Sequence, residues 1–251
     1  MELLASGRTA EVFAWDDGRV LKLDRPEWNG LSALEASALA AVTEVGVAAP
    51  RPHGLVMVGA RHGVVLDRID GPMLADVISE ATDVEPLAIA WTLMHASVNA
   101  PTVGGLPDLV SGLVNSLRTS GLEPALVEEL LASLADLDDC TRHLCHFDLH
   151  PRNVIVSPTG WVVIDWMTAS SGPPDADFAR TLLFDRPGTG SPSARFMAAV
   201  KRRGMEARHL DPSRLDAWIR VIAGARLAEG FEGEHAAYLT AIASGDRRID
   251  D

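Results

Sequence analysis

The sequence predicts an α+β protein built from two unequal parts, and three observations support this. The first β-like runs gather within residues 1–70, whereas helical periodicity dominates residues 71–251. A breaker pair, Gly71-Pro72, follows a buried-looking strand at the junction. Strands clustered before helices are typical of α+β proteins. We therefore expect a smaller N-terminal lobe over residues 1–70 and a larger, mostly helical lobe over residues 71–251.

The N-terminal lobe reads as strands with one helix among them. Residues 11–15 and 19–23 are β-type runs joined by Asp16-Asp17-Gly18, a strong hairpin signal. A helix is expected to begin at Ser32 and to end at Gly46. Its apolar face follows the helical period and consists of Leu31, Leu34, Ala38, Leu39 and Val42. Two further β-like runs follow, over residues 55–58 and 63–66.

The second lobe is predicted to be helical with one β interruption. The expected helices cover residues 73–80, 84–99, 122–138, 192–204, 211–229 and 234–243. The β-like runs that interrupt them cover residues 143–146, 153–157 and 161–165.

Composition excludes some partners. The chain has 251 residues, with 22 basic and 35 acidic side chains and a formal net charge of −13. So acidic a chain is a poor candidate for binding nucleic acid or an anionic membrane, because phosphate contacts need clustered Lys and Arg. The N-terminus lacks the pattern of a signal peptide, so we expect a cytoplasmic protein. The two cysteines, Cys140 and Cys145, have no CxxC spacing and are expected to be buried thiols.

The most informative stretch for chemistry covers residues 146–166. It reads His-Phe-Asp-Leu-His-Pro-Arg-Asn and then two apolar β-runs that form a hairpin. Asn153 stands just before the first strand, Asp165 stands at the end of the second, and the loop that carries Asp148 leads into the hairpin. These three side chains are thereby brought toward one end of a small sheet. Oxygen ligands of this kind suit Mg²⁺ together with substrate phosphates.

This stretch resembles the catalytic loop and metal-binding strand end of the protein-kinase-like superfamily, in its aminoglycoside phosphotransferase and choline kinase branch. The kinase pattern is H-x-D-x-x-x-x-N with a further Asp after a hairpin. His150, Pro151 and Asn153 fit the branch's His-Gly-Asp-x-His-x-x-Asn, and Ile164-Asp165-Trp166 matches its Ile-Asp-Trp. Phe147 replaces the usual Gly, and the resemblance extends over residues 3–230.

The resemblance implies a protein-kinase-like two-lobed fold and phosphoryl transfer from ATP or GTP with Mg²⁺. It makes Asp148 the catalytic base for the attacking hydroxyl, and Asn153 and Asp165 the Mg²⁺ ligands. His146 is expected to be a buried orienting residue and His150 a supporting one.

The same resemblance implies a Lys on the third strand and a Glu on the next helix, which together engage the α- and β-phosphates. Lys22, flanked by apolar residues, supplies the first and Glu35 the second, whereas Glu44 lies too near the helix end. Without the resemblance, both would be interpreted as solvated charges.

Three further elements of the family can be assigned. The phosphate-covering loop would contain Ser6, Gly7 and Thr9, although it has only one Gly where kinases have several. The backbone around Asp67 and Ile69 would bind the adenine edge. His95 is expected to be a packing residue, and Asp177 to act as a helix N-cap or as a tie to the catalytic loop; both lie in family-like helices.

We expect the phosphate acceptor to be a hydroxyl of a small molecule: an aminoglycoside or other antibiotic, or else an amino alcohol or sugar. Acidic side chains that could face a polycation are Asp175, Glu229, Glu232 and Glu234, and no aromatic cage for choline is visible. Two other classes compete with a kinase. One is a catalytically silent nucleotide-binding pseudokinase. The other is a metallohydrolase based on His146, Asp148 and His150. The sequence carries no signal for oligomeric state.

Overall fold

The structure is a computed structural model that describes residues 1–16, 18–183, 190–229 and 238–242. The chain divides into two compact units. The first comprises Met1–Val77, Val103–Leu106 and Asp148–Ala169, and the second comprises Ile78–Thr102, Pro107–Phe147 and Ser170–Asp251. The lobe boundary expected between residues 70 and 71 stays a prediction.

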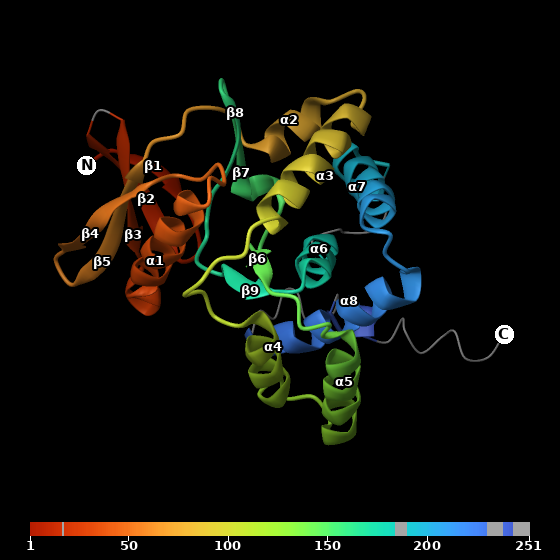
Figure 1. The fold of residues 1–251 in the computed structure, drawn as a ribbon. Helices are drawn as coiled ribbons and strands as arrows, with labels where there is room; N and C mark the ends of the chain where they lie inside the picture. The colour runs from red at the N-terminus through yellow and green to blue at the C-terminus, as the bar shows by residue number, and fades with distance from the viewer. Residues whose placement is uncertain (17, 184–189, 230–237, 243–251) are drawn as a thin grey trace. The chain divides into compact units, whose positions relative to one another are not determined.

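The first unit contains a five-stranded antiparallel sheet with the strand order β1-β2-β3-β5-β4 (Figure 1). The strands are β1 (Leu3–Ser6), β2 (Ala10–Asp16), β3 (Arg19–Asp24), β4 (Pro52–Val58) and β5 (Arg61–Asp67). Apolar side chains of β3 and β5, including Leu21, Leu23 and Val65, form a buried cluster. The expected runs over residues 11–15, 19–23, 55–58 and 63–66 are therefore all strands. Residue 17 of the predicted hairpin turn lies outside the described residues.

Helix α1 (Leu31–Glu44) packs on this sheet, and its start is fixed from a distance. Asp24, buried at the end of β3, accepts hydrogen bonds from the backbone N–H groups of Gly30 (2.8 Å) and Ser32 (3.1 Å) and from the Ser32 hydroxyl (2.9 Å). A carboxylate at a helix N-terminus satisfies N–H groups that have no partner within the helix. The short 3₁₀ turn η1 (Pro26–Trp28) spans the gap between Asp24 and the helix.

The prediction that Leu34 lies on the buried apolar face of α1 is wrong, because Leu34 is 59% exposed. The buried residues of the helix are Ser32, Glu35, Ala38, Leu39 and Val42. Two polar residues occupy the buried face because each has a charged partner on β3. Hydrophobic periodicity counts only apolar residues. It therefore assigned Leu34 to the buried face and left out Ser32 and Glu35.

A second, two-stranded sheet in the first unit carries the motif of residues 146–166. After the 3₁₀ turn η2 (Pro151–Asn153), β7 (Val154–Ser157) and β8 (Gly160–Val163) form the predicted hairpin. The chain segment after β5 lies against β7: Met73 bridges Ile155, and the Val156 N–H donates to the Pro72 carbonyl at 2.9 Å. Gly71 has φ +150°, and a Cβ there would lie 2.2 Å from the Val156 carbonyl oxygen, so only Gly fits.

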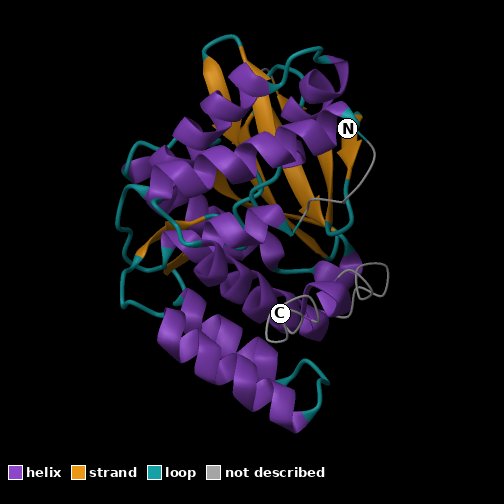
Figure 2. Ribbon diagram, turned by 90° about the vertical axis from the view of Figure 1, so that its right-hand side faces the viewer, coloured by secondary structure: helices purple, strands orange, loops and turns teal. Residues whose placement is uncertain are grey.

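The second unit is mostly helical (Figure 2). Its helices are α3 (Glu85–Asn99), α4 (Leu109–Arg118), α5 (Pro124–Leu137), α6 (Pro174–Leu182), α7 (Pro192–Arg208) and α8 (Pro212–Arg226), followed by the 3₁₀ turn η3 (Leu227–Glu229). Helix α2 (Leu74–Glu80) spans the division between the units, and β6 (His143–Cys145) pairs with β9 (Ser170–Gly172).

Helix α8 is the centre of the second unit, because it packs against α4, α5 and α6 and its Trp218 is fully buried. Helix α4 was not predicted, although Leu109, Leu113 and Leu117 recur on its buried face at intervals of four residues. Of the helix expected over residues 234–243, residues 238–242 are helical and the others lie outside the described residues. Of the two thiols expected to be buried, Cys145 is buried but Cys140 is exposed.

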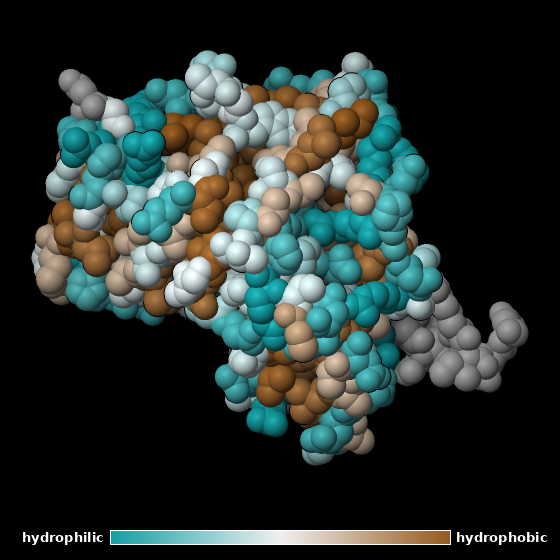
Figure 3. All heavy atoms as spheres, in the orientation of Figure 1, coloured by the Kyte–Doolittle hydropathy of each residue, from teal (hydrophilic) through white to brown (hydrophobic). Residues whose placement is uncertain are grey.

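The surface of the described chain mixes polar and apolar side chains. Figure 3 shows apolar surface over the β4–β5 end of the sheet, where Leu55 and Met57 are exposed. No helix that the structure describes is both long enough and apolar enough to span a membrane.

Candidate phosphoryl-transfer site

Lys22 joins two carboxylates within the first unit. Its Nζ lies 2.7 Å from Glu35 Oε2 on α1 and 2.8 Å from Asp165 Oδ1, just beyond β8. Lys22 lies on the central strand β3, between Val12 of β2 and Val64 of β5. The predicted third-strand Lys and the Glu of the next helix are therefore brought together with the Asp that follows the hairpin.

Burial and charge oppose each other in this cluster. The Lys22 side chain is only 14% exposed. Burial alone would lower its pKa, but the negative charges of Glu35 and Asp165 outweigh this and raise the pKa of Lys22 above its ordinary value. Burial raises the pKa of Glu35, and the attraction of Lys22 offsets only part of that effect. The raised pKa keeps Lys22 protonated, and it lies beside the Asp165 carboxylate, whose side chain is 33% exposed.

Asp165 and Asn153 are neighbours because the hairpin closes between them. Val154 pairs with Val163, and the Ile164 N–H donates to the Asn153 carbonyl at 2.9 Å. Asp165 has φ +65°, a left-handed conformation that is uncommon for a residue other than Gly. Backbone outliers of this kind concentrate at functional sites.

The loop that carries Asp148 is tied to the same hairpin. Asn153 Nδ2 donates to the Asp148 carbonyl at 2.9 Å and lies 3.5 Å from Asp148 Oδ2. His150 Nε2 lies 3.8 Å from the same carboxylate oxygen, while His150 Nδ1 accepts the Arg152 N–H at 3.2 Å. Because Nδ1 accepts, the proton of a neutral His150 ring is on Nε2, the nitrogen that faces Asp148.

The donor set fits a magnesium ion. The Asn153 amide is oriented by its Nδ2 bond to the Asp148 carbonyl, which turns the opposite end, Oδ1, away from that carbonyl. An amide oxygen and the Asp165 carboxylate are hard ligands, and Mg²⁺ usually completes its shell with phosphate and water oxygens. Within the described ranges, no group of three or more His, Cys, Asp or Glu residues is arranged to hold a metal by itself. A magnesium ion that binds together with nucleotide phosphates needs only one or two protein ligands.

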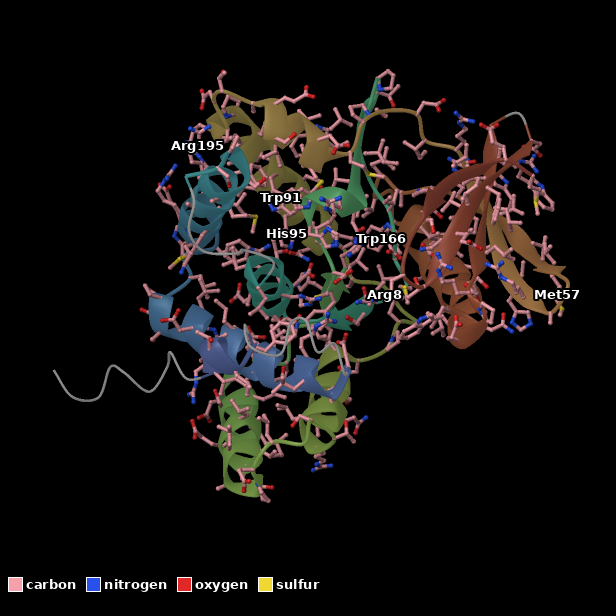
Figure 4. The ribbon with its side chains drawn as sticks, turned by 180° about the vertical axis from the view of Figure 1, so that it is seen from behind. Arg8, Met57, Trp91, His95, Trp166 and Arg195 are labelled. Carbon is pink, nitrogen blue, oxygen red and sulfur yellow. The ribbon has the colours of Figure 1, made fainter. Side chains whose placement is uncertain are left out.

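A second polar cluster lies in the second unit, around the fully buried Asp177 of α6. Asp177 accepts hydrogen bonds from the backbone N–H groups of Phe147 (2.7 Å) and His146 (3.2 Å) and from Asn99 Nδ2 (2.8 Å). His95 Nε2 lies 3.2 Å from it, and Figure 4 shows His95 beside Trp91 on α3. The prediction that Asp177 ties the catalytic loop is confirmed; the N-cap of α6 is Pro173 instead.

Phe147 adopts φ +59°, the left-handed region that Gly enters most easily. This explains why the family pattern has Gly at this position. The bond from the Phe147 N–H to Asp177 holds the strained residue in place.

The predicted phosphate-covering loop lies between β1 and β2. The Gly7 N–H donates to the Ala10 carbonyl at 2.9 Å, which makes the loop a tight turn over Arg8 and Thr9. Ser6 Oγ and the Gly7 carbonyl both accept hydrogen bonds from Arg25, at 2.7 and 2.9 Å. Arg25 is not recognisable from the sequence, because a cation 18 residues away from Gly7 carries no local signal.

At the predicted hinge, Asp67 and Ile69 differ. The Asp67 N–H donates to the Arg51 carbonyl at 3.1 Å, and its carboxylate lies 2.6 Å from His53 Nε2. Ile69 is half-buried, and no hydrogen bond joins its backbone to any other residue that the structure describes. Among the residues that the structure describes, no hydrogen bond or ion pair joins Lys22 to the loop or to the hinge.

The residues proposed to face the acceptor have other partners or are outside the described ranges. Asp175 lies 3.9 Å from both Arg208 and Arg214, and Glu229 pairs with Arg226. Burial raises the pKa of Asp175, with Arg208 and Arg214 opposing the rise. Glu232 and Glu234 lie outside the described residues.

The fold is shared with solved aminoglycoside phosphotransferases. A thermostable mutant of aminoglycoside phosphotransferase APH(4)-Ia, in a ternary complex with AMP-PNP and hygromycin B, is 18% identical with a TM-score of 0.73, over 99% of this chain and 94% of that one. ADP-bound APH(2'')-Ib is 14% identical with a TM-score of 0.62, over 96% of this chain and 91% of that one. Aminoglycoside-3'-phosphotransferase of type VIII is 19% identical with a TM-score of 0.62, over 92% and 91%.

These similarities confirm the predicted α+β, kinase-like fold. A model of the phosphotransferase enzyme family (APH) matches residues 1–210. The chain belongs to this family, which confirms the predicted resemblance and disfavours a metallohydrolase. No curated protein matches the sequence.

Proposed function

We propose that the protein transfers the γ-phosphate of ATP or GTP to a hydroxyl of a small molecule. The observation that carries this proposal is the cluster in which Lys22 contacts both Glu35 and Asp165, beside the hairpin that also positions Asn153 and Asp148. Phosphoryl transfer needs positioning and charge neutralisation more than covalent chemistry, and this set supplies both. A nucleotide-dependent enzyme of this kind is expected in the cytoplasm.

Each residue has a distinct role in the proposal. Asp148 orients the acceptor hydroxyl and accepts its proton, and Asn153 holds the Asp148 loop by its carbonyl. Lys22, kept in place by Glu35, binds the α- and β-phosphates. Asn153 and Asp165 would hold Mg²⁺, which neutralises phosphate charge when bound.

The nucleotide would be bound by the loop and the hinge. Ser6, Gly7 and Thr9 lie in a turn between two strands, where backbone N–H groups can meet phosphates. Ile69 offers a backbone N–H and carbonyl to an adenine edge, and Asp67 anchors the end of β5 through Arg51 and His53. Nucleotides in two of the similar structures, AMP-PNP and ADP, support this role.

Two acceptor classes are supported by different observations. Hygromycin B in a similar structure supports an aminoglycoside or a related antibiotic. The arginine partners of Asp175 and Glu229 favour a less cationic acceptor, such as a sugar or an amino alcohol, because those carboxylates are already neutralised. A polycation would have to displace the arginines.

The test is a screen of ATP and GTP consumption with aminoglycosides, other natural-product antibiotics, amino alcohols and sugars. For the compound that stimulates turnover, we expect Asp148→Asn to lower kcat by about 10²–10⁴-fold, the usual contribution of a general base. Nucleotide affinity should be retained. Asp70→Asn is the matched control, because the only partner of this exposed carboxylate among the described residues is the nearby Arg68.

Three results would contradict the proposal in different ways. Full activity of Asp148→Asn would remove Asp148 from the mechanism. Nucleotide binding without turnover on any acceptor would favour a pseudokinase. Absence of ATP and GTP binding would overturn the assigned function altogether.

A further inference from the structure

Arg25 donates three hydrogen bonds to the segment that joins β1 and β2. Its Nε donates to the Gly7 carbonyl at 2.9 Å, and its Nη2 donates to Ser6 Oγ at 2.7 Å. Its backbone N–H donates to the Thr9 carbonyl at 2.8 Å. The two carbonyls of the turn that face Arg25 are therefore held by a single residue at the end of β3.

Because the peptide group is planar, a hydrogen bond that fixes the direction of a carbonyl also fixes the direction of the next N–H group. In a trans peptide, the carbonyl and the following N–H point in opposite directions, and the described chain has no cis peptide bond. The Gly7 carbonyl points to Arg25, so the Arg8 N–H points away from it. The Thr9 carbonyl does the same, so the Ala10 N–H also points away. Arg25 therefore fixes the orientation of two peptide groups in this turn, and the backbone N–H groups of turns are where anions bind.

Arg25 is itself held in position by charged neighbours in the same unit. Its Nη1 lies 3.7 Å from Glu11 Oε1, while Glu11 Oε2 accepts a hydrogen bond from Arg61 at 2.7 Å. Arg61 Nε also donates to the Asp24 carbonyl at 2.6 Å. The Arg25 side chain is 34% exposed but is restrained from β2, β3 and β5. A side chain ordered in advance loses little conformational entropy when a ligand binds.

We propose that Arg25 is a positioning residue for the nucleotide phosphates. It sets the peptide orientation that extra glycines would otherwise allow in a phosphate-covering loop, and this loop has only one Gly. The inference rests on the proposed nucleotide-dependent function. It assigns Arg25 to recognition of the phosphate chain and not of the nucleoside.

The test compares ADP with adenosine, because only ADP carries phosphates. In Arg25→Ala, calorimetry should show at least about a tenfold loss of ADP affinity, as expected when an orienting pair of hydrogen bonds is lost. Adenosine affinity should not change. The KM for ATP should rise more than kcat falls. Arg25→Lys should restore only part of the ADP affinity, because an ammonium lacks the planar fork of a guanidinium.

Arg19→Ala is the matched control: Arg19 begins β3, the strand that Arg25 follows, and it pairs with Asp16 at 3.7 Å across the hairpin. It should bind ADP like the wild type. Should Arg25→Ala fail to fold, Arg25→Gln carries the same test, because it keeps a donor but loses the fork and the charge. Equal losses for ADP and adenosine would reveal a general structural role and overturn the inference. So would unchanged ADP affinity. A wild type that binds no nucleotide overturns the proposed function as well, which distinguishes the two failures.

Discussion

Two carboxylates are buried to a similar degree, one in each unit, but their surroundings differ. Glu35 is 2% exposed and pairs with the ammonium of Lys22, which it shares with Asp165. Asp177 is 0% exposed and accepts hydrogen bonds from two backbone N–H groups and from Asn99. Although burial opposes it, hydrogen bonding from His95 and Asn99 holds the pKa of Asp177 well below its usual range. Burial raises the pKa of Glu35.

This difference separates a buried charge with a structural role from one that can bind a ligand. Asp177 accepts hydrogen bonds from two backbone N–H groups and from a buried Asn. It therefore fixes the backbone that leads into the Asp148 loop. Lys22 is held between two carboxylates, and the Asp165 side chain is 33% exposed. A cation that two carboxylates hold in position, one of them partly exposed, is suited to bind a ligand.

The strongest test of this comparison exchanges one carboxylate in each unit for alanine. Asp177→Ala should lower the free energy of unfolding by about 3–5 kcal/mol, because it leaves buried donors without their acceptor. Asp165→Ala should cost about 1 kcal/mol or less, since the carboxylate is partly exposed, yet abolish phosphoryl transfer. Urea denaturation and a transfer assay measure the two effects. Similar stability losses in the two variants would break the comparison.

A smaller effect is expected from the backbone frame of the first unit. Gly71→Ala forces φ +150° on a residue with a side chain and places its Cβ against the Val156 carbonyl. We expect a loss of about 1–3 kcal/mol, the usual range for a strained backbone position. Gly104→Ala, which meets no atom within 4 Å, is the control and should be neutral or slightly stabilising. Thermal unfolding checks both, and equal melting temperatures would contradict the role given to Gly71.

The smallest effect is a pH dependence of stability from the Asp177 cluster. Burial lowers the pKa of His95 below its ordinary 6.5, with Asp177 opposing and Arg208 and His146 reinforcing the decrease. Below pH 6.5 the unfolded chain therefore binds a proton that the folded chain does not. Stability from this group is present above that pH and is lost as the pH falls.

Urea denaturation between about pH 8 and pH 5 measures this dependence, across the range in which an unperturbed His titrates. His95→Gln should flatten the acid side of the profile, whereas His62→Gln, on the exposed side of β5, should leave it unchanged. An unaltered slope in His95→Gln would contradict a neutral, buried His95.

The sequence indicated residues of the candidate site, but it did not indicate most of their distant partners. Asp148, Asn153 and Asp165 were recognisable because a short loop and hairpin keep them within 18 residues, so local spacing carries the signal. Lys22 and Glu35 could be assigned only through the family resemblance, since each alone is interpreted as a surface charge. Leu34 was misplaced because the buried face of α1 contains Ser32 and Glu35, and hydrophobic periodicity does not register polar residues with distant partners.

The sequence alone was enough to predict the fold class, most of the strands and helices in their order, and the motif of residues 146–166. These follow from periodicity, turn residues and spacing, which are local properties of the chain. The folded structure was needed to show that Lys22 contacts both carboxylates, that Asp177 binds the backbone before Asp148, and that Arg25 bonds to Ser6 and Gly7. These contacts join residues 13 to 143 positions apart, and their geometry exists only once the chain has folded.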